Sequence, residues 1–160
     1  MRTLQTDYLM LAALPSAVGS ARRYARRMLA DWGLAAMTDD VEIVVSELVT
    51  NAVKASGGAE ARPPWSRLHE RLEVIYLSMS ATVEDTVIVE VWDGEAAPPV
   101  ELEAEADAES GRGLKLVGAL SLRWGTRWPS GGGKIVWSEC ACRRDPCPGG
   151  LPAGPPRPER

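Results

Sequence analysis

The sequence predicts a single small domain of the α/β class, in which helices and strands share one hydrophobic core. Its 160 residues suffice for one ordinary core, and 45% of them are hydrophobic while 25% are charged. Apolar residues recur every three to four positions in some segments, which indicates amphipathic helices. In other segments they alternate with polar residues, which indicates strands.

The first two elements are a strand and a helix. Residues 3–14 alternate weakly and predict a strand that Pro15 ends. From Ser16 the apolar positions form one helical stripe, and Gly33 ends that helix. Four arginines lie mostly off the stripe, and we expect them to form a solvated face, with a binding patch as the alternative: Arg22, Arg23, Arg26 and Arg27.

A second helix is predicted from Thr38 to the residues before Gly57. Thr38 is a suitable N-cap residue, and Asp39 and Asp40 suit the positive end of the helix dipole. Residues 57–72 carry Gly, Pro and charge without a clear period and predict a surface loop.

Two strands follow, at 74–80 and 86–93. Because the link between them is short, we expect an antiparallel hairpin. In the second strand Val87, Val89, Val91 and Asp93 share one face, which the helices should cover.

The remaining elements are a loop, a third helix and a last pair of strands. Residues 94–110 predict the loop, and the helix runs from Gly113 to about Leu122. Strands at 122–128 and 134–140 flank a glycine turn at 131–133. Residues 143–160 are rich in Pro and Gly and predict a disordered tail, so the folded domain should span 1–142.

Composition argues against several classes of function. The net charge of −4 does not favour a general nucleic-acid-binding surface. No apolar stretch approaches the roughly 18 to 20 residues that span a bilayer, and the N-terminus lacks the order of a secretory signal. We therefore expect a cytoplasmic protein without a membrane partner. Cys140, Cys142 and Cys147 lack a nearby fourth ligand, so we expect reduced thiols and not a metal site.

Glu47 and Asn51 are the first candidate site residues. Four residues apart on the second helix, they lie on the same face, and Lys54 continues that edge. Hard oxygen ligands of this kind suit magnesium, and a Glu beside such a site can orient or deprotonate a hydroxyl. The alternative is a polar stripe exposed to solvent.

Asp93 is the second candidate. An acid at the end of a buried strand face requires a fixed hydrogen-bond donor, which an exocyclic purine amine would supply. Alternatively, Asp93 simply begins a turn, since Asp-Gly at 93–94 is a common turn pair.

The third candidate is the segment Gly111-Arg112-Gly113-Leu114, a glycine-rich turn that opens a helix. Such turns let backbone amides approach a phosphate, and a helix N-terminus adds partial positive charge. The sequence contains no Walker A loop, since no G-x4-G-K-S/T occurs and Lys134, which follows three glycines, precedes a strand. The segment is not a Rossmann fingerprint either, because Gly111 does not directly follow a strand.

Taken together and in this order, the segments resemble one family. S-E-L-V-T-N-A-V-K (46–54), V-E-V-W-D-G (89–94), G-R-G-L-K-L-V (111–117) and G-G-K-I-V-W (132–137) are similar to the four nucleotide-binding boxes of the histidine-kinase-like ATPases, the GHKL or Bergerat-fold proteins. Within that family the chain most resembles the stand-alone bacterial anti-sigma-factor serine/threonine kinases and their actinobacterial relatives. The resemblance covers about residues 3–140.

The resemblance implies a fold and a set of roles. The fold would be a two-layer α+β sandwich, with a mixed, mostly antiparallel sheet and helices on one face. Glu47 would be the general base, Asn51 the magnesium ligand and Asp93 the acceptor for the adenine amino group. The nucleotide-binding residues would be Asn51, Lys54, Asp93, Gly94, Gly111, Arg112, Gly113, Leu114 and Lys134.

It also implies an activity and partners. The cofactors would be ATP and Mg²⁺, and the γ-phosphate would pass to a serine of a STAS-type anti-anti-sigma protein. A sigma factor is a further expected partner, a homodimer is compatible with the family, and direct binding to nucleic acid is not expected.

The alternative is a non-catalytic, protein-binding regulator of the anti-sigma type with structural or lost nucleotide binding. Three departures from the family favour this alternative. Glu95 stands where many relatives have Gly, and Ile135 stands in place of a hydroxyl residue near the adenine. The third is a run of five acids at alternate positions over 101–109.

Overall fold

The computed structural model describes residues 3–56, 73–98 and 112–142. The predicted loop at 57–72, the acidic segment 101–109, Gly111 and the predicted tail at 143–160 lie outside these residues.

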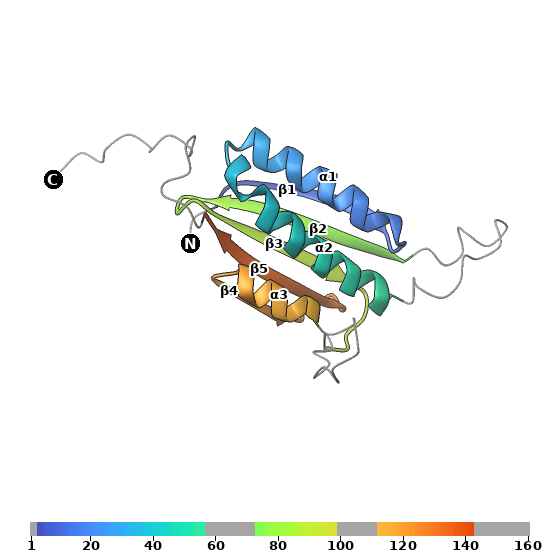
Figure 1. The fold of residues 1–160 in the computed structure, drawn as a ribbon. Coiled ribbons are helices and arrows are strands. Elements are labelled where there is room, and N and C mark those ends of the chain that lie inside the picture. Colours follow the sequence, from blue (N-terminus) through green and yellow to red (C-terminus); the bar gives the residue numbers. More distant parts are fainter. Residues whose placement is uncertain (1–2, 57–72, 99–111, 143–160) are drawn as a thin grey trace.

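Five strands form one sheet in the order β1-β2-β3-β5-β4 (Figure 1). Their bounds are Thr3–Ala12 for β1, Val74–Thr82 for β2, Thr86–Asp93 for β3, Arg123–Arg127 for β4 and Lys134–Ala141 for β5. The predicted hairpin of β2 and β3 is confirmed. All four neighbouring pairs are antiparallel, so the expected mixed sheet shows no parallel pair among the strands that the structure describes.

Three helices cover one face of this sheet: α1 (Ser16–Asp31), α2 (Thr38–Ala55) and α3 (Arg112–Leu120) (Figure 1). The helix α2 is central, because it packs against α1, α3, β3 and β5. The predicted two-layer α+β architecture is therefore confirmed.

The hydrophobic core lies between α2 and the middle strands. The alternation read from the sequence places every second residue of β2 and β3 under the helices, and the helical stripe of α2 meets them. The fully buried members include Ile75, Leu77 and Met79 of β2, Val87 and Val89 of β3, and Val41, Val44, Val45, Leu48 and Val49 of α2.

The start of α2 differs from the expectation in one detail. Thr38 is the first helical residue, and the N-cap position belongs to Met37, at the end of a 3-10 turn over Ala35–Met37. The Thr38 hydroxyl donates to the carbonyl of Ala35 at 2.8 Å and does not cap the helix. The prediction of Thr38 as N-cap was wrong because the preceding turn already supplies a helical entry.

The arginines of α1 are exposed, as expected of a solvated face, but one of them is tied to the core. The guanidinium of Arg26 donates to both carboxylate oxygens of the buried Glu42 on α2, at 2.7 and 3.0 Å. Arg22 lies 3.6 Å from the same carboxylate. Burial of Glu42 therefore depends on this bidentate contact, which joins the two helices.

The thiol expectation holds for one cysteine and fails for another. Cys140 is a buried thiol outside any disulfide, whereas Cys142 is disulfide-bonded. Sequence spacing could not reveal this, because a disulfide depends on the distance and direction between Cβ atoms. None of the described helices has the length and apolar character needed to cross a membrane.

The opposite face of the sheet is not covered by the three helices (Figure 1). Tyr8 and Met10 of β1 and Tyr76 of β2 are 70%, 63% and 43% exposed there. Tyr76 is opposite both Met10 and Trp92, and its ring meets that of Trp92 edge-on at 5.5 Å between centroids. We call Tyr8, Met10, Tyr76 and Trp92 the aromatic patch.

A contact between α1 and α2 gives the first testable prediction. Arg26→Met removes both hydrogen bonds to the buried Glu42, leaving only the longer Arg22 contact, and should lower the free energy of unfolding by about 1 to 2 kcal/mol. The matched control is Arg27→Met, since Arg27 pairs with Asp31 on the surface, and a change within about 0.5 kcal/mol is expected. Urea denaturation measures both, and equal effects would show that Glu42 does not need Arg26.

Candidate functional site

The helix α2 places Glu47 and Asn51 one turn apart on one side. Both side chains are half-buried, so the alternative of a fully exposed polar stripe does not hold for them. Within the described part of the chain neither side chain makes a hydrogen bond or an ion pair. Half-buried oxygens without a protein donor suit an external hydrogen-bond donor or a hard cation.

The first turn of α3 lies directly against Glu47. A Cβ atom built on Gly113 would be 2.3 Å from Glu47 Oε2 and 3.3 Å from its Cδ. With glycine at this position the turn lies close to the carboxylate, and a side chain there would require the end of the Glu47 side chain to move. Next to it Leu114 is buried and anchors the turn in the core. Two segments more than sixty positions apart in the sequence therefore meet at Glu47.

The second part of the site is a buried ion pair at the end of β3. Asp93 and Lys134 are opposite each other in the register of β3 and β5. Their side chains are 1% and 3% exposed, and Lys134 Nζ donates to Asp93 Oδ1 at 2.7 Å. Lys134 Nζ also donates to the carbonyl oxygen of Glu95 at 3.1 Å. The charge of Asp93 is thus balanced inside the protein.

Asp93 also begins the turn that follows β3. Its Oδ1 accepts the backbone N–H of Glu95 at 3.0 Å, which is the geometry of an Asx turn. Both interpretations from the sequence therefore apply to Asp93, as a buried acid on the helix-covered face and as a turn residue. The hydrogen bonds from Lys134 and Glu95 both end on Oδ1. Oδ2 therefore retains acceptor capacity for a further donor.

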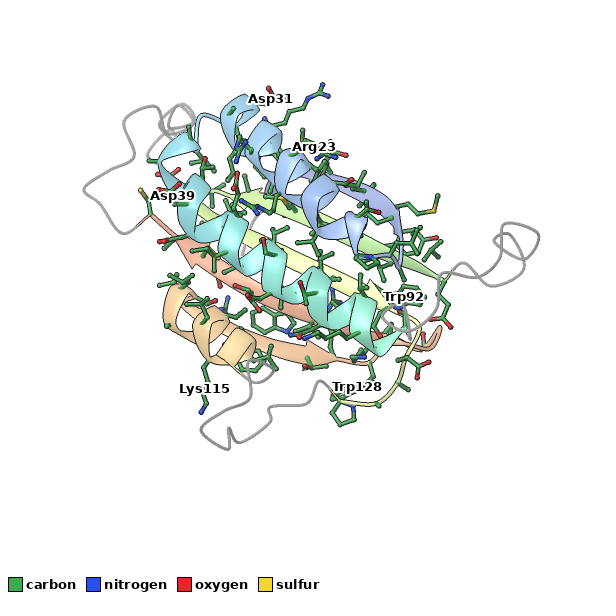
Figure 2. All side chains as sticks on the ribbon, turned by 45° about the vertical axis from the view of Figure 1, so that its right-hand side comes forward. Arg23, Asp31, Asp39, Trp92, Lys115 and Trp128 are labelled. Carbon is green, nitrogen blue, oxygen red and sulfur yellow. The ribbon has the colours of Figure 1, made fainter. Side chains whose placement is uncertain are left out.

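The glycine turn before β5 closes this end of the sheet. Gly132 and Gly133 have φ values of +91° and +72°, and a Cβ on Gly133 would lie 2.3 Å from the backbone oxygen of Asp93. The indole N–H of Trp92 donates to the carbonyl of Gly132 at 3.1 Å. In Figure 2, Trp92 lies where α2 ends, which places the ion pair and the C-terminal turns of α2 at the same end of the domain.

The other predicted site residues are less engaged. Lys54 and Gly94 are exposed. Arg112 begins α3, so its backbone is placed beside Gly113, whereas Gly111 lies outside the described residues. Ile135 is opposite Trp92 and so belongs to the sheet face away from the helices. The residue opposite Asp93 is Lys134, so Ile135, which was expected near the adenine, does not share the sheet face of Asp93.

Sequence reasoning missed the partnership of Lys134 with Asp93. The pairing depends on the register of β3 and β5, strands that are separated by α3 and β4. A signal was available, since a lysine that begins a predicted strand needs a carboxylate partner if that strand is buried. The described residues contain no group of three or more His, Cys, Asp or Glu side chains that would by itself hold a metal ion. A cation at Asn51 would therefore need further oxygen ligands from a bound molecule or from water.

Comparison with known proteins identifies one family. The family model described as histidine kinase-like ATPase domain matches residues 11–137, which is most of the chain and includes both parts of the site. No curated protein matches the chain.

The glycine turn gives the second prediction. Gly133→Ala forces a side chain into the left-handed region and against the backbone of Asp93 and the Trp92 ring, and should destabilise the fold by about 2 kcal/mol or more. Gly131→Ala is the matched control, because nothing lies within 4 Å of its Cβ position, and its melting temperature should stay close to that of the wild type. Thermal unfolding followed by circular dichroism compares the two; similar melting temperatures would contradict the close approach at Gly133.

Proposed function

This chain belongs to the histidine kinase-like ATPase family, and we propose that it is a cytoplasmic, ATP- and magnesium-binding regulator that phosphorylates a serine of a protein partner. The partner class that fits best is a STAS-type anti-anti-sigma protein, with a sigma factor as a second partner. This proposal goes beyond the family membership in its substrate, its partners and its compartment.

The observation that carries the proposal is the contact between Glu47 and Gly113. It brings a half-buried carboxylate to the N-terminal turn of a helix, where free backbone N–H groups and a partial positive charge suit the phosphates of a nucleotide. The residue proposed as the base thus lies beside a helix N-terminus suited to anions. Phosphoryl transfer needs mainly this, the positioning of a nucleophile and the neutralisation of charge.

In the proposed reaction Glu47 accepts the proton of the serine hydroxyl as its oxygen attacks the γ-phosphorus. One P–O bond forms to the serine, the bond from the γ-phosphorus to the bridging oxygen breaks, and ADP leaves with that electron pair. The backbone N–H groups at the start of α3 and the guanidinium of Arg112 would hold the phosphate oxygens. Lys54, exposed at the same edge of α2, would attract the anionic substrate.

Asn51 would hold magnesium through its amide oxygen, with the remaining ligands from phosphates and water. A magnesium ion held there would supply positive charge to neutralise the phosphate oxygens. Asp93 Oδ2 would accept a hydrogen bond from the amino group of adenine. Gly94 leaves the space after β3 free of a side chain. Leu114 would keep the α3 turn in place.

A second candidate function is supported by the sheet face away from the helices. This function is a protein-binding regulator with structural or lost nucleotide binding. The aromatic patch exposes large apolar side chains, and exposed patches of this kind are typical of interaction sites. Further along the same face a hollow of about 310 Å³ is lined by Ile88, Glu90, Arg123, Arg127, Trp137 and Glu139. A homodimer could use the same face, so the partner is best tested directly.

The third prediction concerns Glu47. Glu47→Ala removes the proton acceptor and should reduce transfer of labelled phosphate from ATP to a STAS protein by about 100-fold or more, while calorimetry with ATP and magnesium shows nearly unchanged affinity. The control is Glu84→Ala, since Glu84 is exposed in the turn after β2. Transfer that survives Glu47→Ala would remove Glu47 from its role, and a wild-type protein that binds ATP without transfer would favour the second function.

The fourth prediction separates partner binding from nucleotide binding. Tyr8→Ser with Met10→Ser removes the most exposed part of the aromatic patch and should weaken the complex with the STAS protein by roughly 10-fold or more, with ATP affinity unchanged. Val83→Ser is the control, because Val83 is exposed in the hairpin turn, away from the patch. Equal partner affinity in the wild type and the double variant would show that the partner docks elsewhere.

A further inference from the structure

The buried ammonium group of Lys134 has one donor more than the acceptors that the described residues offer it. A lysine ammonium carries three hydrogens. The described residues provide two acceptors, Asp93 Oδ1 at 2.7 Å and the Glu95 carbonyl at 3.1 Å. The side chain is only 3% exposed, so water reaches it poorly. A buried donor without an acceptor is unfavourable, and a bound ligand that supplies one would be stabilised.

We propose that Lys134 recognises the base of the nucleotide by donating its third hydrogen to N1 of adenine. N1 lies next to the 6-amino group, whose hydrogen bond Asp93 would accept. This inference rests on the proposed binding of ATP at Asp93 and adds a specificity residue to that site. The Watson–Crick edge of adenine has a donor, the 6-amino group, beside an acceptor, N1. The ion pair offers the complementary acceptor and donor close together, since Lys134 Nζ lies 2.7 Å from Asp93 Oδ1 and Oδ2 belongs to the same carboxylate.

The same geometry rejects 6-oxopurines. In guanine and hypoxanthine the order is reversed, since O6 accepts and N1–H donates. With the ring in the same place, O6 would face the carboxylate and N1–H would face the ammonium. An acceptor would then face an acceptor and a donor would face a donor, in a buried site where unpaired polar groups are most unfavourable. Lys134 therefore strengthens a preference that Asp93 alone would give only through one contact.

A purely structural role for Lys134 makes a different prediction. If the ammonium only balances the charge of Asp93, removal of the N1 acceptor from the ligand changes nothing at Lys134. If Lys134 donates to N1, that removal leaves a buried N–H without its partner. The ligand 1-deaza-ATP makes this change, because it has C–H in place of N1 and keeps the 6-amino group.

The test is isothermal calorimetry of the full chain with magnesium and ATP, 1-deaza-ATP or ITP. We expect 1-deaza-ATP to bind roughly 10- to 100-fold more weakly than ATP, and ITP to bind more weakly than 1-deaza-ATP. ATP and 1-deaza-ATP of equal affinity would overturn the inference and leave the proposed function standing. Absence of ATP binding would overturn the proposed function and the inference together.

A Lys134 variant provides a second test with ATP and 1-deaza-ATP. In Lys134→Met the two ligands should bind with equal affinity, because the donor to N1 is gone. A variant that still discriminates would show that N1 is read elsewhere, again overturning the inference. The matched control is Lys115→Met, since Lys115 is exposed on α3 and points away from the sheet (Figure 2), and this variant should keep the wild-type ratio. The ligand comparison on the wild type decides the question even if Lys134→Met does not fold.

Discussion

The buried ion pair between Asp93 and Lys134 constrains the end of the domain at which the candidate site lies. Two charges out of water must be held in close contact and given further hydrogen bonds, which the N–H and C=O of Glu95 provide. The contact requires β3 and β5 in one register, and that register requires Gly133 against the Asp93 backbone. Strand pairing, turn and charge thus depend on one another.

The helix α2 relates this pair to the rest of the site. It packs on β3 and β5, where the pair lies, and on α3, whose first turn touches Glu47. The bidentate contact of Arg26 with Glu42 fixes the other half of α2 against α1. One helix therefore sets the separation between the ion pair of Asp93 and Lys134 and the Glu47 carboxylate. Candidate site residues held by such an element are positioned more accurately than residues on loops.

Most of the fold could be predicted from local patterns, and the parts that could not depend on long-range register. Alternation in β3 placed Asp93 under the helices, and the spacing of Glu47 and Asn51 on α2 was correct because a helix has a fixed period. The N-cap at Thr38 failed because the 3-10 turn before it is set by packing. Lys134 and Ile135 are neighbours in β5 and lie on opposite faces, so only the register with β3 shows that Lys134 is the one beside Asp93.

The ion pair is better explained by a ligand than by stability. A buried pair gains little for the fold, because the attraction between its charges is offset by the loss of their hydration, and apolar residues of similar size often replace such pairs without loss. Here the pair lies beside a turn of exposed residues, Gly94 to Ala97, at the end of the sheet where α2 ends. With Oδ2 and one ammonium hydrogen still able to bond, it presents an acceptor and a donor in fixed positions. A partner whose edge carries the complementary donor and acceptor would satisfy both groups, which the residues described by the structure do not.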